Sequence, residues 1–263
     1  MAIPAARDTG ILTGDMLEVM EYDIQNNEQE AGEPSFGELY IDVRYKEKRV
    51  LTDCQVMFLP DIDPKHIHFN EWEIRKRSSQ RLIDCLKAKG RPLNILEIGC
   101  GNGWLSAKMA AVKNTTVKGI DANELEIKQA KRVFTNTNLE FFYAGFDPEM
   151  FGDERFDVIV FAASVQYFSS LPDVLQSALS RLTKNGEVHL TDTHFYSPSE
   201  AASAAQRTFD YYESMGYPEM AAHYFHHTVN DLRGFNYRVL FNPHRLINKF
   251  TKKDPFYWIV VKN

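Results

Sequence analysis

Cysteine is scarce in this chain of 263 residues, which holds only Cys54, Cys85 and Cys100 and no C-x-x-C pair. This odd, widely spaced set excludes a disulfide framework and a zinc knuckle, so we expect reduced thiols in a cytoplasmic protein. Long apolar runs are also missing, since no stretch reaches the ~18 apolar residues that a membrane span requires. Residues 1–14 lack the continuous apolar core of a signal peptide. We therefore expect neither a membrane span nor an export signal.

Positive charge is in short supply as well. The chain has 30 Lys and Arg against 36 Asp and Glu, which gives a formal net charge of -6 at pH 7. A protein that follows a nucleic-acid backbone needs a clustered basic face, and the basic runs at 75–77 and 252–253 are short. The balance counts against a nucleic-acid partner and favours a small-molecule partner. The sequence carries no signal for an oligomeric state.

Short apolar segments alternate with amphipathic ones from residue 71 onward. We expect strands at 93–98, 116–120, 139–143, 158–162 and 187–191, and helices at 71–89, after the first strand to about 112, at 124–134 and at 172–182. Two final strands are expected at 237–241 and 256–261. This alternation is typical of an α/β fold with helices on both faces of the sheet. We predict a doubly wound, mostly parallel, seven-stranded sheet.

Two regions fall outside this alternation. Residues 1–70 are expected to form an N-terminal extension, which starts with an acidic, mobile lead-in over 18–34. The β-branched and aromatic segments 38–45 and 49–57 then predict a β-hairpin, with a polar turn at 46–48. The main domain would be 71–263, and it would carry a helical cap inserted at about 194–235. An insertion at that place can cover a ligand site.

A glycine-rich loop follows the first strand of the series. Glu97-Ile98-Gly99-Cys100-Gly101-Asn102-Gly103 lies between that strand and a helix, where glycine lets the backbone turn sharply and approach a ligand. A dinucleotide fingerprint, G-x-G-x-x-G, would need glycine at the next position, where this chain has Trp104. Trp104 therefore argues against a dehydrogenase, and no P-loop sequence is present. The remaining alternative is a tight structural turn without a ligand.

An acidic residue ends the next predicted strand. Asp121 lies twenty-four positions after Glu97, which is one βαβ spacing. A carboxylate at this place can accept two hydrogen bonds from ribose hydroxyls. The glycine loop and the acid together are far more specific than either feature alone.

On these residues the chain resembles the class I S-adenosylmethionine-dependent methyltransferases, especially the small-molecule group that includes the ubiquinone and menaquinone C-methyltransferases. The resemblance covers about residues 93–191. It implies a Rossmann-like methyltransferase fold, with S-adenosylmethionine as cofactor and S-adenosylhomocysteine (SAH) as product. It also implies that the glycine loop holds the methionine part of the cofactor and that Asp121 holds its ribose.

The resemblance further implies a set of cofactor-binding residues, carried over by position. These are Glu97, Gly99, Cys100, Gly101, Asn102, Gly103, Asp121, Ala122, Asn123, Phe146, Asp147 and Ala162. Phe146 has the alternative of a plain core residue. Asp147 precedes Pro148 and has the alternative of a turn residue.

The acceptor side has fewer signals. Methyl transfer is an in-line displacement that depends mainly on alignment and on the exclusion of water, and only a hydroxyl or an acidic carbon needs a base. His194, with Asp192 to orient it, and His226 on the insertion are the candidate bases. The candidates for the acceptor pocket are Tyr167, Tyr196, His223 and His227. The alternative for each is a capping, core or surface side chain.

The end of the fourth predicted strand, Ala162-Ala163-Ser164, lacks the signatures of other methyltransferase classes. It has no Asn/Asp-Pro-Pro-aromatic, Pro-Cys or paired-glutamate sequence, and no acid of the metal-dependent catechol type. The prediction is therefore methyl transfer to a small molecule, with no metal. The alternatives are an RNA or protein methyltransferase and a non-catalytic regulatory protein that binds S-adenosylmethionine.

Overall fold

The computed structural model describes residues 35–245 and 254–263. The lead-in predicted over 18–34 and the basic run at 252–253 lie outside the described residues. Residues from Phe36 onward form one unit by their mutual contacts. Among the described residues, the helices are all too short or too polar for a membrane crossing.

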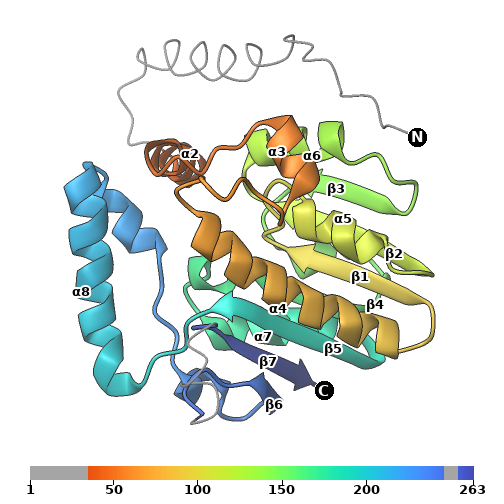
Figure 1. Cartoon of the computed structure of the whole chain (residues 1–263). Coiled ribbons are helices and arrows are strands. Elements are labelled where there is room, and N and C mark those ends of the chain that lie inside the picture. Colours follow the sequence, from red (N-terminus) through yellow and green to blue (C-terminus); the bar gives the residue numbers. More distant parts are fainter. Residues whose placement is uncertain (1–34, 246–253) are drawn as a thin grey trace, which may run out of the picture. The chain divides into compact units, whose positions relative to one another are not determined.

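A seven-stranded sheet in the order β3-β2-β1-β4-β5-β7-β6 runs through this unit (Figure 1). Its strands are β1 (Leu93–Ile98), β2 (Thr115–Asp121), β3 (Leu139–Tyr143), β4 (Phe156–Ala162), β5 (Leu182–Thr193), β6 (Asn236–Phe241) and β7 (Tyr257–Lys262). The first five strands are parallel, and β7 pairs antiparallel with both β5 and β6. The predicted doubly wound, mostly parallel sheet is confirmed.

Helices cover both faces of the sheet because its central strands are apolar on both sides. The covering helices are α4 (Phe69–Ala88), α5 (Trp104–Ala110), α6 (Glu124–Val133) and α7 (Leu171–Ser180). Ile95 packs in one buried cluster with residues of α4, α5 and α6, whereas Leu96 and Ile98 pack in another with α7. Successive side chains of a strand point to opposite faces, so β1 contributes to both clusters. Parallel strands of this kind place their carboxyl ends along one edge of the sheet.

The segment before α4 is helical, and the predicted hairpin is wrong. Helices α2 (Phe36–Lys46) and α3 (Asp53–Phe58) occupy the two segments that were expected as strands. Leu39, Ile41 and Val43 alternate with polar or aromatic residues, which is the strand pattern. The buried pair, however, is Leu39 and Val43, four residues apart, as on one face of a helix. Tertiary contacts therefore determine that this segment is helical.

The partner of α2 is the segment between β5 and β6. Helix α8 (Pro198–Met215) and the 3-10 turns η4 (Pro218–His223) and η5 (Val229–Leu232) occupy this segment. Leu39 and Val43 of α2 form a buried cluster with Tyr212 of α8 and Met220 of η4. Burial of such side chains contributes roughly 1.5–3 kcal/mol each. This packing holds α2 and α8 together beside the carboxyl edge of the sheet (Figure 1).

Candidate functional site

A cavity of about 340 Å³ lies at the carboxyl ends of β1, β2 and β4, and we call it the first cavity. Open α/β sheets bind ligands at this edge. Most of the residues predicted to bind a cofactor line it, namely Glu97, Gly99, Cys100, Gly101, Asn102, Asp121, Ala122, Asn123, Phe146 and Ala162. The structure thus brings together residues from three strand ends that the sequence places up to 65 positions apart.

Two glycines of the loop, Gly99 and Gly103, lie too close to neighbouring side chains to carry a Cβ atom. Gly99 and Gly103 have φ values of +74° and +77°, which side chains rarely adopt. A Cβ on Gly99 would lie 2.4 Å from Cβ of Ser164, and one on Gly103 would lie 2.4 Å from the ring of Phe141. Gly103 is the N-cap residue of α5 and is not among the residues that line the first cavity. A glycine at position 103 is needed for the close packing of the loop against Phe141. The cavity itself is lined by the preceding loop residues, Gly99 to Asn102.

Asp121 joins the loop to the turn after β2. Its Oδ2 accepts a hydrogen bond of 2.8 Å from the N–H of Gly101, and its Oδ1 accepts one of 2.8 Å from the N–H of Asn123. Burial raises the pKa of Asp121, although these backbone hydrogen bonds oppose that shift. A carboxylate has about four lone-pair positions, so Asp121 can also accept from ligand hydroxyls.

Glu97 lies at the floor of the first cavity and is only 2% exposed. The hydroxyl of Ser106 donates a hydrogen bond to its Oε2. Burial nevertheless raises the pKa of Glu97 to about 8. A cationic group in the cavity would favour the ionised form.

Glu126, in the first turn of α6, is a lining residue that the sequence did not reveal. Its buried Oε2 has no hydrogen-bond partner. Burial and the nearby charge of Asp121 raise the pKa of Glu126. From the sequence alone, a charged residue near the start of an amphipathic helix cannot be recognised as a ligand-binding residue, because solvent-exposed helix faces carry the same residue types. Its role depends on the position of α6 against the glycine loop.

Comparison with known families identifies the same part of the chain. The family model described as a methyltransferase domain matches residues 95–186. A ubiquinone biosynthesis O-methyltransferase from Pelagibacter ubique is 32% identical over 128 residues, covering 47% of this chain and 52% of the relative. These matches support a class I S-adenosylmethionine-dependent methyltransferase domain within residues 95–186.

Other similarities support the same family and fold. A malonyl-[acyl-carrier protein] O-methyltransferase from Halalkalibacterium halodurans is 26% identical, covering 46% of this chain and 48% of the relative. The chain spans about half the length of these curated relatives. Magnesium protoporphyrin IX methyltransferase from Synechocystis PCC 6803, solved with bound SAH, matches in fold with a TM-score of 0.56 at 15% identity. That match covers 87% of this chain and 96% of the other.

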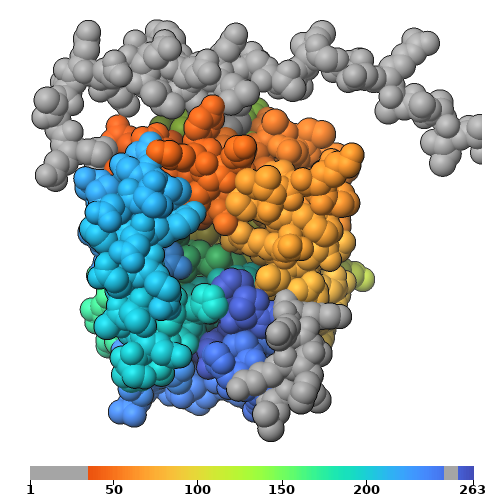
Figure 2. Space-filling model, turned by 60° about the vertical axis from the view of Figure 1, so that its left-hand side comes forward, coloured from red at the N-terminus to blue at the C-terminus, as the bar shows by residue number. Residues whose placement is uncertain are grey.

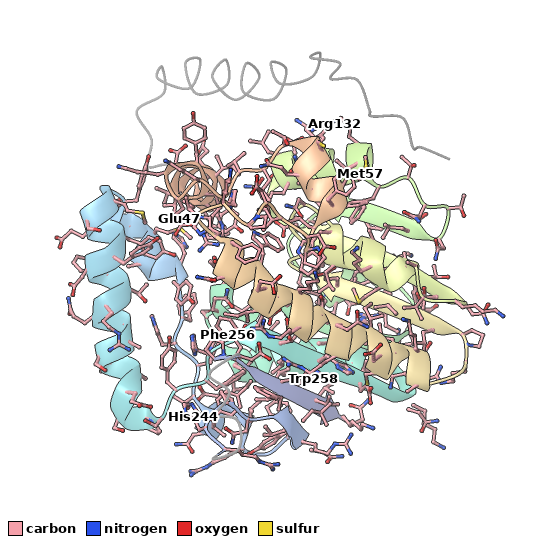
Figure 3. The ribbon with its side chains drawn as sticks, viewed as in Figure 1. Glu47, Met57, Arg132, His244, Phe256 and Trp258 are labelled. Carbon is pink, nitrogen blue, oxygen red and sulfur yellow. The ribbon has the colours of Figure 1, made fainter. Side chains whose placement is uncertain are left out.

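A second cavity, of about 400 Å³, lies next to the first. The two cavities share the lining residues Tyr40, Arg44, Arg49, Glu71, Arg75, Ala163 and Tyr167. Residues of α4 and α8 line the second cavity from opposite sides, and Figure 2 shows the surface hollowed between these two helices. Glu47 and Phe256, both labelled in Figure 3, also line it. Helix α2 contributes side chains to both cavities. The sequence pattern of this segment predicts a β-hairpin, and it therefore does not predict these lining residues.

The predicted acceptor-pocket residues separate into two groups. Tyr167 and Tyr196 line the second cavity. The ring of His223 packs against Phe36, with 5.1 Å between ring centroids. The buried His227 has its Nε2 3.0 Å from the carbonyl oxygen of Val165. These two histidines are not lining residues of either cavity and have the contacts of packed side chains.

The two histidines predicted as bases also lie outside both linings. Nε2 of His226 is 2.8 Å from the hydroxyl oxygen of Thr208. His194 is exposed, and its ring packs against Phe256 at 4.7 Å. Asp192, which was expected to orient His194, accepts a hydrogen bond from Ser78. The catalytic roles of His194 and His226 stay predictions.

Two predicted cofactor residues near the end of β3 differ in position. Phe146 lines the first cavity and meets Phe161 edge-on, with 6.4 Å between ring centroids. Asp147 is exposed, and its Oδ1 accepts a hydrogen bond of 2.9 Å from the N–H of Glu149. Asp147 therefore has the geometry of the turn residue that was its alternative.

A group of polar side chains under β5 has metal-ligand chemistry. Potential ligand atoms of Cys85, Glu187 and His189 lie within 4.8 Å of one another. Trp258, labelled in Figure 3, donates a hydrogen bond of 3.0 Å to Nδ1 of His189, and Nε2 of the same ring is 2.9 Å from Glu187. Glu187 also pairs with Lys89 and Lys262. The imidazole has no free lone pair in this network, which therefore does not suit a metal ion.

Proposed function

We propose that this protein transfers the methyl group of S-adenosylmethionine to a small molecule, with the cofactor in the first cavity and the acceptor in the second. The observation that carries this proposal is the junction of the two cavities at Ala163 and Tyr167. Methyl transfer needs the donor and the acceptor in line and shielded from water. Adjoining cavities under a shared helix, α2, supply that arrangement.

The first cavity suits the cofactor by its chemistry. Three carboxyl groups with raised pKa values, those of Glu97, Asp121 and Glu126, line it. S-adenosylmethionine is a cation with an ammonium, a sulfonium and two ribose hydroxyls, and it would bring positive charge and further hydrogen-bond donors to these carboxyls. In this proposal Asp121 accepts from the ribose hydroxyls and Glu97 accepts from the ammonium. The bound cofactor supplies an electrophilic methyl group.

The predicted side-chain roles follow from this arrangement. Gly99 to Asn102 would surround the methionine part, and Phe146 would pack against the adenine. Trp104 would close the first cavity on the side of the glycine loop, because its ring meets that of Trp72 on α4 edge-on, with 5.4 Å between ring centroids. Residues of this kind exclude water and fix the orientation of the cofactor, and neither task requires a proton transfer.

A small acceptor agrees with the charge of the chain and with the named relatives. The net charge of -6 counts against an RNA substrate. The relatives from Pelagibacter ubique and Halalkalibacterium halodurans are both named O-methyltransferases, which supports oxygen as the methylated atom. A cytoplasmic location belongs to the same proposal, supported by three cysteines that are all free.

Calorimetry with SAH and with NAD, followed by a transfer assay, tests the proposal. We expect SAH to bind and NAD not to bind. Labelled S-adenosylmethionine incubated with fractions of a metabolite extract is then expected to give a labelled small molecule. Binding of NAD alone would exclude a methyltransferase, and SAH binding with no transfer to any fraction would favour the non-catalytic regulatory protein.

A further inference from the structure

The side chain of Asp192, near the carboxyl end of β5, is only 8% exposed and lines the second cavity. Its Oδ2 accepts a hydrogen bond of 2.9 Å from the hydroxyl of Ser78 on α4. Its Oδ1 is buried and has no hydrogen-bond partner. A buried, unpaired carboxylate oxygen is costly, and native structures retain few of them. The missing partner of Oδ1 is therefore a donor that a ligand of the second cavity can supply.

The backbone places Asp192 where the two cavities meet. Ala162 of β4 pairs with Thr191 of β5, so the residues that follow them, Ala163 and Asp192, lie at the same edge of the sheet. Both have positive φ values, +54° for Ala163 and +57° for Asp192. Ala163 lines both cavities. A group bound to Asp192 would thus lie on the acceptor side of this junction.

Burial also changes the acidity of this carboxyl group. It raises the pKa of Asp192, against the opposing effects of Arg75, the Ser78 hydrogen bond and Arg81, while the charge of Asp254 acts in the same direction as burial. A carboxylate with a raised pKa is a stronger base than a solvated one.

Aromatic rings form much of the wall around Asp192. Tyr167 meets Tyr40 edge-on at 5.6 Å and Tyr224 at 5.8 Å, and all three line the second cavity together with Tyr196 and Phe256. Aromatic side chains of this kind favour a flat ring between them. The shape of the wall therefore favours an acceptor that contains a ring.

Three of the four arginines that line the second cavity form ion pairs with glutamates of the same cavity. Arg49 and Arg75 both pair with Glu71, at 2.6 and 3.0 Å, and Arg44 pairs with Glu47 at 3.5 Å.

Arg207 of α8 also lines the cavity and forms no ion pair with any residue in the described ranges. Its Nη1 donates a hydrogen bond of 3.4 Å to the hydroxyl of Ser203, which leaves its positive charge without a counter-ion. A guanidinium in this state favours an anionic group on the acceptor.

We propose that the second cavity binds a ring-containing, anionic methyl acceptor, and that Asp192 accepts the proton of its hydroxyl group during transfer. This inference rests on the proposed function. The hydroxyl oxygen forms a bond to the methyl carbon while the carbon–sulfur bond breaks, and that electron pair returns to sulfur, which becomes a neutral thioether. The hydroxyl proton passes to Oδ1 of Asp192 and then to water. Arg207 holds the anionic group of the acceptor.

The first experiment compares probes on the SAH-loaded wild-type protein by calorimetry. The hydroxyl-bearing acids are 4-hydroxybenzoate, 3,4-dihydroxybenzoate and 4-hydroxyphenylacetate, and the matched probes are benzoate, which lacks the hydroxyl, and phenol, which lacks the charge. We expect at least one hydroxy acid to bind about tenfold more tightly than both matched probes, as one additional hydrogen bond to a charged group allows. Equal affinities, or no binding of any acid to protein that has bound SAH, would overturn the inference. Failure of SAH itself to bind would instead overturn the proposed function.

The second experiment measures transfer of a labelled methyl group to the best of these acids. Asp192→Asn keeps the size of the side chain, and asparagine tolerates the positive φ at this position. We expect turnover to fall about 100-fold or more, with the affinity for SAH within twofold of wild type. Asp173→Asn, at an exposed site on α7, is the matched control. Unchanged turnover in Asp192→Asn would contradict the role of this residue. The wild-type probe series decides the acceptor class even if the variant does not fold.

Discussion

The backbone N–H of Gly101 donates a hydrogen bond of 2.8 Å to Oδ2 of Asp121. This contact links the glycine loop after β1 to the acid at the end of β2. A ligand that binds Asp121 therefore also depends on the conformation of the loop. The two sequence features act as one structural unit.

Replacing Asp121 tests this unit. In Asp121→Ala both backbone donors, on Gly101 and Asn123, lose their carboxylate acceptor. Hydrogen bonds to a charged group contribute about 1.5–3 kcal/mol each, so we expect the affinity for SAH to fall at least about tenfold. Calorimetry measures this change, with Asp173→Asn as the control for an exposed acid. An SAH affinity equal to that of wild type would remove Asp121 from the site.

The raised pKa of Glu97 predicts that SAH binding depends on pH. In the free protein the carboxyl group is mostly protonated below a pKa of about 8. The ionised carboxylate binds the ammonium of SAH much more strongly than the neutral acid does, so affinity should rise between pH 6 and pH 8. Release of one proton limits this rise to about tenfold per pH unit.

Glu97→Gln provides the matched control for that pH dependence. The variant keeps a hydrogen-bonding side chain but cannot ionise, so its SAH affinity should be lower and nearly constant over the same range. If the SAH affinity of this variant still changes with pH, the remaining change is due to ionisation of Asp121 and Glu126, whose pKa values are also raised. A wild-type affinity that does not change between pH 6 and pH 8 would contradict the role of Glu97.

The extent to which the sequence predicts this molecule depends on the range of the interactions involved. The strands and the glycine loop are local features, and β1 and β3 have the predicted bounds. Helix α2 was missed because Leu39, Ile41 and Val43 alternate like a strand, while contacts with α8 decide its conformation. Its side chains in the two cavities, such as Tyr40 and Arg44, were missed with it.

The acceptor side was less predictable for a related reason. His194 and Asp192 lie two positions apart near the end of the same strand, and both have side chains able to accept a proton. Only the structure shows that His194 is exposed while Asp192 is buried with an unpaired oxygen. Residue type and spacing indicate which chemistry is available, whereas burial and packing determine which side chain faces the ligand.

The glycines of the fold give a stability prediction that separates backbone strain from crowding. Gly90 and Gly103 both have positive φ, +62° and +77°, but a Cβ on Gly90 meets nothing within 4 Å. Gly90→Ala should therefore lower the free energy of unfolding by about 1–2 kcal/mol, from strain alone. Gly103→Ala adds a contact of 2.4 Å with Phe141 and should lower it by at least about 3 kcal/mol. Urea unfolding measures both, and equal losses would contradict the crowding of Gly103.

Glu187 predicts the acid sensitivity of the fold. Burial opposes its ionisation, but hydrogen bonds from His189 and Lys89 outweigh burial and hold the pKa of Glu187 well below its usual value. A lowered pKa means that the ionised group stabilises the folded state above pH ~4.3, its ordinary pKa, and that this stabilisation decreases as the pH falls further. Glu187→Gln leaves the Lys89 and Lys262 ammonium groups without their carboxylate. At pH 7 the variant should lose about 3 kcal/mol of the free energy of unfolding.

The difference between wild type and Glu187→Gln should narrow as the pH falls from 6 to 3, because the wild-type carboxylate loses its advantage over the unfolded chain in that range. Urea unfolding at several pH values measures the difference. Glu140→Gln is the control, since Glu140 is exposed on β3 and should change stability by less than about 0.5 kcal/mol at any of these pH values. A difference for Glu187→Gln that stays constant down to pH 3 would mean that ionisation of Glu187 does not stabilise this fold.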